Sequence, residues 1–275
     1  MVSDVLDKEQ PGVDTEGMKS LRSALRVLME FCEEQQDFGV GELADRCKLS
    51  KSQVSKVLAT FGEFGLLTQV PESRRYHVGA RLYALGSRYL NFDLLCRGGM
   101  PVMRDLVEAT GHSARLSVLD GDRVLYLLGI EGPLFVDTGW RAGTWLPVHS
   151  TTSGRVLLAT MDPERARRLR PRQLTAFTDR TITDLDEVDR LIEQARVQGY
   201  SLQRGETTPG LGVISAPVYG RGLQPLGTLG LAFPSHVVPP ADEPPLIAAL
   251  HGACRVLSQR LGCTVYPYGH TPATK

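Results

Sequence analysis

The first ninety residues carry three runs of apolar positions at helical spacing, followed by two short extended runs. The helical runs fall within SLRSALRVLMEFC, GELADRC and SKSQVSKVLATF, where apolar side chains recur every three or four residues. Ser50 suits the N-cap of the third helix, and Gly62 and Gly65 close it. The extended runs flank a Pro-Glu-Ser-Arg turn at residues 71–74, which predicts a small hairpin. Another helix is predicted over ARLYALGSRYL.

Beyond residue 100 the pattern mixes antiparallel strands with helices, which predicts an α+β fold class. Gly98, Gly99 and Pro101 indicate a junction, and a helix that ends at Gly111 follows it. Alternating apolar runs around Asp120-Gly121 predict a hairpin. The later segments predict a loop leading into a helix (HSTTSGRVLLATM), a helix (TDLDEVDRLIEQARVQGY), two strands (GLGVISAPVYG and LGTLGLAF) and a last helix over residues 243–261.

Composition narrows the class of protein. Of 275 residues, 42% are hydrophobic and 23% charged, and 31 basic side chains balance 31 acidic ones, as in a soluble globular protein. No apolar run approaches the roughly 18 residues that a membrane span needs. The acidic N-terminal segment lacks the apolar core of a signal peptide, so we expect a cytoplasmic protein with no membrane contact. The five cysteines are widely spaced without a CxxC pair, so neither a disulfide framework nor a zinc site is expected.

Three short helices followed by a hairpin is the element order of a winged helix-turn-helix. Its recognition helix presents polar and basic side chains to the major groove of DNA, while an apolar face locks it onto the scaffold. Gln53 suits an adenine edge, and serine and lysine side chains suit phosphates. The candidate residues for contact with double-stranded DNA are Lys48, Ser50, Lys51, Ser52, Gln53, Ser55 and Lys56 around the third helix, and Arg74 and Arg75 at the wing tip.

Local charge supports this interpretation. Between residues 46 and 81, seven basic side chains face two acidic ones, a net charge of +5 in a chain of net charge zero. The seven are Arg46, Lys48, Lys51, Lys56, Arg74, Arg75 and Arg81, and the two are Glu63 and Glu72. A solvated helix face would give the same charge count. Together with the element order, however, the positive segment favours a phosphate-binding face.

From about Met18 to Leu261 the chain resembles the IclR family of transcriptional regulators. The matching stretches, in the family's order, are SALRVLMEFC, ELADRCKLSKSQVSKVLATFGEFGLL, YHVGARLYALG, LPVHSTTSGRVLLA, TITDLDEVDRLIEQARVQGY and GLGVISAPV. The resemblance implies an N-terminal winged helix-turn-helix over residues 18–79, a linker helix over 80–100 and a GAF-like effector domain over 101–262, with an antiparallel sheet flanked by helices. Residues 1–17 are then a disordered segment and 263–275 a loose tail.

The resemblance also implies function. We expect a ligand-responsive regulator, most simply a repressor, that acts as a homodimer or a dimer of dimers on a DNA operator. Two residues depart from the family pattern. Lys48 stands where the family usually has glycine, which costs on the order of 1 kcal/mol if its φ is positive. Lys56 stands where arginine is frequent, and a lysine loses bidentate recognition of guanine.

A hydroxyl-rich loop before an apolar helix is the second candidate site. Its backbone N–H groups suit a carboxylate, although one of its hydroxyls would serve equally as a plain N-cap. The resemblance places this loop and the glycine-rich strand at an effector cavity. The candidate effector-binding residues are Leu116, Tyr126, Leu128, Trp140, Leu146, His149, Ser150, Thr151, Thr152, Ser153, Gly154, Glu206, Leu211, Val213 and Ser215.

A small acidic effector follows from these residues. Trp140 and Trp145 favour an aromatic or bulky apolar ligand body, or else belong to the core or a subunit interface. Arg115 or Arg141 would neutralise a ligand carboxylate. The sequence leaves open the identity of the effector, the operator and the regulated pathway.

The motifs of other classes are absent from the sequence. It contains no GxSxG elbow, no complete dinucleotide fingerprint and no phosphate loop, so we expect no enzyme and no cofactor. The histidines form no HxH or HxxxH ligand pair, so no metal is expected. The alternative is a small-molecule hydrolase or sensor with a degenerate DNA-binding domain, in which Ser153 and His149 would act.

Overall fold

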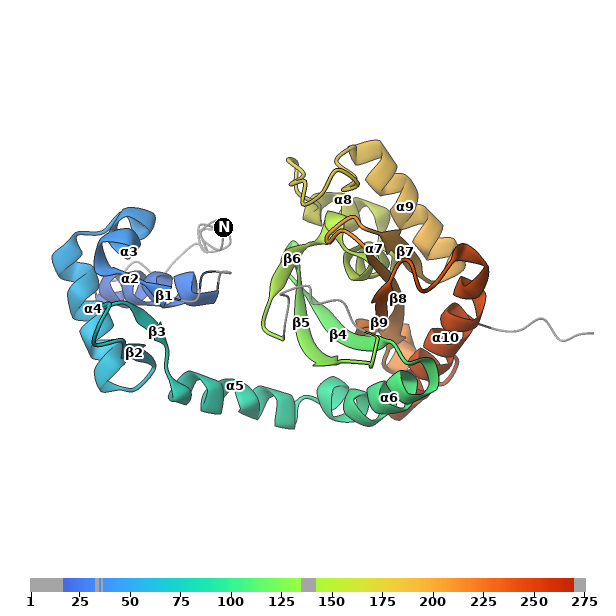
Figure 1. Ribbon diagram of the computed structural model, residues 1–275, viewed down its shortest axis with the longest axis horizontal. Coiled ribbons are helices and arrows are strands. Elements are labelled where there is room, and N and C mark those ends of the chain that lie inside the picture. Colours follow the sequence, from blue (N-terminus) through green and yellow to red (C-terminus); the bar gives the residue numbers. More distant parts are fainter. Residues whose placement is uncertain (1–16, 33–34, 36, 135–141, 270–275) are drawn as a thin grey trace, which may run out of the picture. The chain divides into compact units, whose positions relative to one another are not determined.

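The computed structural model describes residues 17–32, 35, 37–134 and 142–269. The chain divides between Asn91 and Phe92 into two compact units. In Figure 1 the first unit runs from blue to teal and the second from green to red. The segments expected to be disordered or loose at the two termini lie outside the described residues at 1–16 and 270–275.

The first unit is a winged helix-turn-helix. Its elements are α2 (Gly17–Met29), η1 (Glu30–Cys32), β1 (Asp37–Phe38), α3 (Val40–Cys47), α4 (Lys51–Glu63), β2 (Leu67–Gln69), β3 (Tyr76–Val78) and α5 (Ala80–Phe92). The order of the three antiparallel strands is β1-β3-β2. The hairpin β2–β3 was predicted. The edge strand β1 was not, because its two residues lie in a polar stretch with no alternation of apolar positions.

The core of this unit contains the predicted apolar face of α4 but only some of the apolar positions of α2. Val54 and Leu58 of α4 are fully buried, and they belong to one cluster with Val27 of α2. Leu21 and Leu25, two of the apolar positions that recur at helical spacing in α2, are 49% and 45% exposed. This helix carries apolar residues on two stripes, and periodicity alone did not show which stripe meets the core.

The second unit is an α+β domain around a six-stranded antiparallel sheet of order β6-β5-β4-β9-β8-β7. Its strands are β4 (Ser113–Asp120), β5 (Arg123–Ile130), β6 (Trp145–Pro147), β7 (Ser201–Arg204), β8 (Leu211–Tyr219) and β9 (Pro225–Pro234). Its helices are α6 (Leu94–Thr110), η2 (Val148–Ser150), α7 (Thr152–Ala159), α8 (Pro163–Leu169), α9 (Leu185–Gln198), η3 (Arg221–Leu223), η4 (Pro240–Asp242) and α10 (Glu243–Arg260).

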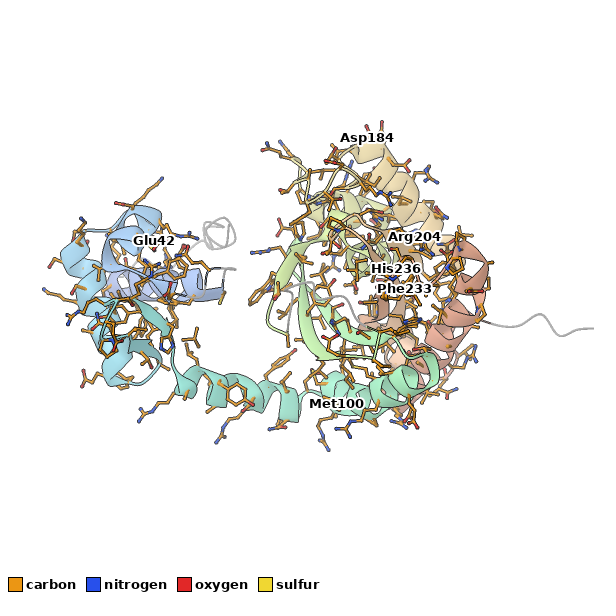
Figure 2. The ribbon with its side chains drawn as sticks, in the orientation of Figure 1. Glu42, Met100, Asp184, Arg204, Phe233 and His236 are labelled. Atoms are coloured by element: carbon orange, nitrogen blue, oxygen red, sulfur yellow. The ribbon has the colours of Figure 1, made fainter. Side chains whose placement is uncertain are left out.

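Helices cover both faces of the curved sheet (Figure 1). α6 and α10 pack together on one face, whereas α7 packs on the other and separates the sheet from most of α9. Arg204 and Phe233, both labelled in Figure 2, lie on the α10 side, where the guanidinium lies 5.6 Å from the ring centroid. Among the helices of the described ranges, none is long and apolar enough to cross a membrane.

The glycine-rich junction predicted before residue 101 is helical instead. α6 begins at Leu94, where Asp93 accepts a hydrogen bond from the Cys96 N–H group (2.9 Å), and the helix continues through Pro101. A Cβ on Gly99 would lie 3.0 Å from a methyl group of Leu116. The glycines therefore let α6 approach the sheet closely, and this packing overrides their poor helix propensity.

The chain after Cys263 is packed rather than loose as far as residue 269. Tyr266 is 3% exposed, and its hydroxyl donates to the Pro217 carbonyl of β8 (3.2 Å). The Tyr268 hydroxyl donates to the Arg196 carbonyl of α9 (3.1 Å). This stretch lacks helical or strand periodicity, so the sequence pattern gave no sign that it would fold back.

Candidate nucleic-acid interface and ligand cavity

A reciprocal capping box fixes the start of α4. The Gln53 N–H group donates to Ser50 Oγ (3.2 Å), and the Ser50 N–H group donates to Gln53 Oε1 (3.1 Å). The predicted N-cap is therefore confirmed. The Gln53 side chain, which we expected at an adenine edge, lends its acceptor oxygen to this cap, so its amide N–H groups are what it can offer to DNA.

The exposed face of α4 carries the polar residues expected there. Lys51, Ser52, Ser55 and Lys56 are all exposed, opposite the buried Val54 and Leu58. Lys48 ends α3 in the left-handed conformation (φ 52°, ψ 46°), and its N–H group donates to the Ala44 carbonyl. A non-glycine residue thus stands at positive φ in the turn, as the departure from the family pattern suggested.

The two arginines of the wing differ in position. Arg74 is exposed at positive φ (57°). The Arg75 guanidinium turns away from the tip: Nε donates to Asp37 Oδ1 (2.8 Å) and Nη2 to Glu42 Oε2 (3.0 Å). We expected both at the DNA; in this structure the Arg75 side chain is paired with residues of β1 and α3 instead.

These ion pairs reduce the number of positive charges between residues 46 and 81 that are available to bind DNA. Arg46 is paired with Glu30, and Arg75 with Asp37 and Glu42; all three carboxylates lie before the segment 46–81 that was counted from the sequence. Hydrogen bonds from Gln35 and Arg75 hold the pKa of Glu42 below its ordinary value. No ion pair joins Lys48, Lys51, Lys56 or Arg74 to another residue of the described ranges. These four cations form the positive face, which we call the basic face.

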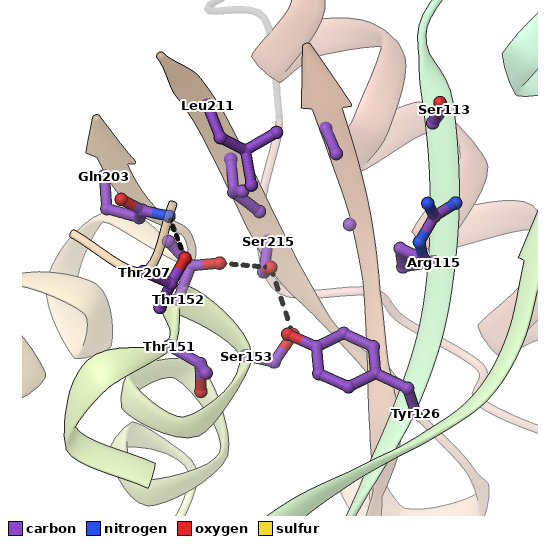
Figure 3. A pocket seen from close by; sticks show the side chains of 13 residues that line it. Ser113, Arg115, Tyr126, Thr151, Thr152, Ser153, Gln203, Thr207, Leu211 and Ser215 are labelled. Carbon is purple, nitrogen blue, oxygen red and sulfur yellow. Dashed lines mark hydrogen bonds between the residues drawn. The ribbon is translucent and has the colours of Figure 1, made fainter. Parts of the chain in front are cut away.

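The second unit contains a cavity between the start of α7 and the sheet (Figure 3). The empty space among its lining atoms, with the solvent at its open mouth included, is about 670 Å³. The lining residues come from five strands, the β7–β8 connection and the start of α7, and they are Ser113, Arg115, Tyr126, Thr151, Thr152, Ser153, Gln203, Thr207, Leu211, Val213, Ser215, Gly230 and Ala232. Seven of the fifteen candidate residues are among them.

Hydroxyl groups dominate one wall of this cavity. Ser215 Oγ lies 2.7 Å from Thr152 Oγ1 and 3.2 Å from Ser153 Oγ (Figure 3). This series of hydroxyl contacts continues into the core, because Ser117 donates to Ser153 (3.0 Å) and its hydroxyl lies 2.8 Å from that of Thr228. Burial raises the pKa of the nearby Tyr126 to about 12, so that side chain stays a neutral phenol. The wall offers neutral donors and acceptors.

The loop before α7 is partly satisfied by its own side chains. Thr151 is the N-cap, and its hydroxyl accepts from the Gly154 N–H group (3.0 Å). A Cβ on Gly154 would overlap the Val148 carbonyl, so the glycine permits close packing of α7 on η2. Capping thus uses one of the donors that we expected to be free for an anion.

Leu116 and Leu128 lie on the other face of the sheet. They pair with each other across β4 and β5, and Leu116 faces α6. Ser117 pairs with Tyr126, so β5 holds an extra residue at a bulge between these two pairs. Tyr126 and Leu128, two residues apart on β5, therefore point to opposite sides of the sheet, although regular alternation would put them on one side.

The remaining candidates lie near the cavity without lining it. Leu146 is buried, and the Ser150 hydroxyl donates to the Pro147 carbonyl (3.2 Å). His149 is 1% exposed, its Nε2 lies 3.1 Å from the Thr175 carbonyl, and burial lowers its pKa. Trp145 donates to Asp120 Oδ2 (2.8 Å). Trp140 and Arg141 lie outside the described residues.

Glu206 is a structural partner. The guanidinium of Arg155, itself fully buried in α7, donates to both of its carboxylate oxygens and to the His149 carbonyl (3.2 Å). A buried ion pair requires such complete hydrogen bonding. The Glu206 N–H group also donates to Gln203 Oε1 (2.7 Å), and Gln203 donates to Thr207 (3.2 Å). This pair therefore holds the β7–β8 connection against α7 and shapes the cavity wall.

Sequence reasoning missed Ser113, Gln203, Thr207, Gly230 and Ala232 in the lining. Ser113 and Gln203 lie in register with Ala232 and Val213 on the cavity face. A register derived from the β8–β9 hairpin would have found Gly230 and Ala232. β7 gave no strand signal.

Ser153 and His149, the pair named for the hydrolase alternative, are not hydrogen-bonded to each other. The Ser153 hydroxyl contacts other hydroxyls, and His149 contacts the Thr175 carbonyl. His149 is therefore not placed to act as the base that activates Ser153.

Comparison with known proteins places both units. Residues 20–71 match the IclR helix-turn-helix domain, and residues 91–259 match the bacterial transcriptional regulator IclR C-terminal domain. The chain is 32% identical to the HTH-type transcriptional regulator KdgR of Escherichia coli strain K12, over 90% of this chain and 96% of that protein. It is 26% identical to the transcriptional repressor IclR of the same organism, over 79% and 80%.

Solved structures agree with these matches. The IclR transcriptional regulator from Alicyclobacillus acidocaldarius superposes with a TM-score of 0.78 at 28% identity, covering 88% of this chain and 98% of that one. The matched family and its relatives are DNA-binding, ligand-responsive regulators rather than enzymes. The chain belongs to the IclR family of transcriptional regulators.

Proposed function

We propose that this chain is a dimeric repressor that holds a two-fold symmetric operator with α4 and the wing, and that releases or tightens it when a small organic acid enters the cavity. The observation that carries the proposal is the capped helix α4, whose exposed residues include two lysines that form no ion pair within the described part of the chain, opposite a buried apolar face. Relatives named as a regulator and as a repressor support the regulatory sense.

On the DNA, each residue of the basic face has a distinct role. Lys51 and Lys56 contact phosphates or base acceptors of the DNA beside α4. Lys48 contacts the DNA backbone from the turn between α3 and α4, and Arg74 reaches the duplex from the wing. Ser50, Ser52, Gln53 and Ser55 lie between these cations and read base edges or fix the register. Arg75 supports the wing instead of touching DNA.

The salt dependence of DNA affinity tests this assignment. Each lost phosphate contact lowers the slope of log affinity against log salt by about 0.9. Lys51→Ala and Lys56→Ala are each expected to lower the slope by that amount on a random duplex, as measured by fluorescence anisotropy. Arg172→Ala, an exposed cation of the second unit, serves as the control. Unchanged slopes for both lysine variants would refute the assignment.

A second copy of the chain covers the exposed stripe of α2. Met18, Leu21 and Leu25 are 43%, 49% and 45% exposed, and their spacing of three and four puts them on one side of the helix. An exposed apolar stripe of this kind marks an interaction surface. A dimer related by a two-fold axis also matches a symmetric operator, whose half-sites lie one helical turn apart.

Light scattering tests the dimer. Leu21→Glu combined with Leu25→Glu is expected to reduce the mass of the particle by half, whereas Val197→Glu, at a position 77% exposed on α9, leaves it unchanged. A wild-type mass of four chains that falls to two would place the stripe in a dimer of dimers. A wild-type monomer would contradict the proposal.

The effector binds in the cavity described above. Its hydroxyl wall and Arg115 suit a small molecule with an acidic group and further polar atoms, and Leu211 and Val213 contact its apolar part. Because the effector and the operator bind to different units, the coupling is a linkage between two binding equilibria. Operator release is measured for a panel of small acids and their neutral amides. Amides that act as well as the acids would remove the acidic group from the proposal.

A further inference from the structure

Arg115 is the charged residue among the described lining of the cavity, and it already holds an anion. Its Nη2 donates to Glu131 Oε1 (2.6 Å), and its Nη1 donates to the Ala114 carbonyl (3.1 Å). Gly129 gives the guanidinium its place, because a Cβ there would lie 3.2 Å from Nη1. The strand pair thus presents a cation to the cavity with an internal carboxylate bound to it.

The same carboxylate engages a second lining residue. Ser113 donates to Glu131 Oε2 (2.8 Å), and Ser113 Oγ accepts from the Gly132 N–H group (3.1 Å). Both cavity-lining side chains at this end, Ser113 and Arg115, therefore donate to one carboxylate. A carboxylate from another source that took this position would find the same two donors.

The two members of the ion pair differ in their exposure to water. The side chain of Arg115 is 15% exposed, whereas that of Glu131 is 45% exposed. Leaving the half-buried guanidinium without an anion is costly, whereas transferring the more exposed carboxylate to water costs little. The pair between Arg155 and Glu206 behaves differently, because its side chains are 0% and 11% exposed and neither partner can be hydrated cheaply.

We propose that Glu131 is a built-in competitor for the effector: it occupies Arg115 in the free protein, and the carboxylate of the effector replaces it. This inference rests on the proposed function, since it concerns the same cavity. In Figure 3, Ser113 and Arg115 lie on one side of the cavity and Thr151, Thr152, Gln203 and Thr207 on the other. The class of ligand is therefore a short hydroxycarboxylate, with its acid at Arg115 and its hydroxyls toward α7 and β7.

The competition has a measurable consequence. The apparent affinity for the effector is the intrinsic affinity multiplied by the fraction of molecules in which Arg115 is free of the internal carboxylate. Binding of Glu131 to Arg115 therefore lowers it. Glu131→Gln keeps the size of the side chain but removes its charge, so it weakens the competitor. Arg115→Gln removes the shared partner. The two substitutions of one ion pair should therefore change affinity in opposite directions, which a merely structural ion pair does not explain.

Calorimetric titration with DL-glycerate, and with glycerol as the neutral match, tests this. Glycerate is expected to bind Glu131→Gln at least fivefold more tightly than the wild type, and to lose binding in Arg115→Gln, with partial retention in Arg115→Lys. Glycerol should not distinguish the proteins. Glu164→Gln, which removes an equally paired but exposed carboxylate on α8, is the control for a general charge effect.

Two outcomes of the comparison would overturn the inference: glycerate binds Glu131→Gln no more tightly than the wild type, or Glu164→Gln shows the same gain. A third is that Glu131→Gln binds no glycerate at about 50 mM ligand, a concentration on the order of a hundred-fold above that of the protein. Thermal unfolding of each ligand-free variant shows whether it is folded. Operator binding is measured in parallel. If all variants hold the operator while glycerate fails, the inference falls and the proposed function stands; if the wild type holds no operator, the proposed function falls.

Discussion

Arg75 of the wing and Asp37 of β1 form an ion pair, with Nε and Oδ1 2.8 Å apart, that ties the hairpin to the helix-turn-helix. The same guanidinium also reaches Glu42, labelled in Figure 2, at the start of α3. The wing therefore has a defined position before any DNA arrives, and its neighbour Arg74 is the residue that the tip presents.

The two arginines should give different phenotypes in DNA binding. Arg74→Ala removes one phosphate contact, so it is expected to weaken binding to all sequences and to lower the salt slope by about 0.9. Arg75→Ala leaves the slope unchanged but loosens the wing, which should show as faster hydrogen exchange of the β3 amides. An unchanged slope for Arg74→Ala together with a lowered slope for Arg75→Ala would contradict the wing geometry.

Lys48 combines a cost in stability with a gain in charge. Its φ of 52° is a conformation in which a side chain costs on the order of 1 kcal/mol relative to glycine. Lys48→Gly should therefore stabilise the α3–α4 turn while lowering the salt slope of DNA binding. Urea unfolding and anisotropy measure the two effects. A variant that is less stable than the wild type would show that the lysine side chain makes a contact worth more than the strain.

Two glycines of the second unit should respond oppositely to alanine. A Cβ at Gly154 overlaps the Val148 carbonyl, so Gly154→Ala is expected to destabilise the domain by about 1–3 kcal/mol. Gly252 of α10 has open space around its Cβ position, so Gly252→Ala should be neutral or stabilising by up to about 1 kcal/mol. The denaturant concentration at the midpoint of unfolding is measured for each variant and for the wild type. Equal midpoints would mean that α7 shifts without cost.

Acid should destabilise the second unit through its buried histidines. Burial, with a smaller contribution from the Arg255 charge, lowers the pKa of His251 from its ordinary 6.5 to about 4. The unfolded chain therefore takes up this proton first as the pH falls. The stability from His251 is complete above pH 6.5 and is lost between about 6.5 and 4, by up to about 3 kcal/mol.

His251→Gln isolates this contribution. The pKa values of His112 and His149 are also lowered by burial, so the variant should retain part of the acid dependence but show a shallower fall in unfolding free energy between pH 7 and pH 4.5. Urea unfolding at several pH values measures the slope. Parallel slopes for the variant and the wild type would assign the acid sensitivity to other groups.

Local signals in the sequence predicted the elements that local interactions decide. Ser50 caps α4, Gly121 turns the β4–β5 hairpin at φ 63°, and Gly199 ends α9 at φ 80°. Each depends on a few neighbouring residues whose conformational preferences agree. The apolar face of α4 followed from spacing for the same reason.

The elements that the sequence did not predict depend on distant contacts. α6 runs through Pro101 because Gly98 and Gly99 fit against Leu257 and Leu116. β1 and β7 are short and lack alternation, so their partners decide them. In the cavity, the bulge on β5 reversed the face of Leu128, and no local pattern shows a bulge. The expected polar lining was correct at Thr151, Thr152 and Ser153, where the loop itself carries the signal.

On the function proposed above, α4 reads DNA sequence in this chain. Selection of genomic fragments by the purified protein at about 150 mM salt, where non-specific binding is weakened, tests it most directly. We expect enrichment of one short, two-fold symmetric site, and loss of that enrichment in the combined Ser52→Ala and Ser55→Ala variant while salt-dependent binding persists. Enrichment without any shared sequence, equal in the wild type and the variant, would contradict it.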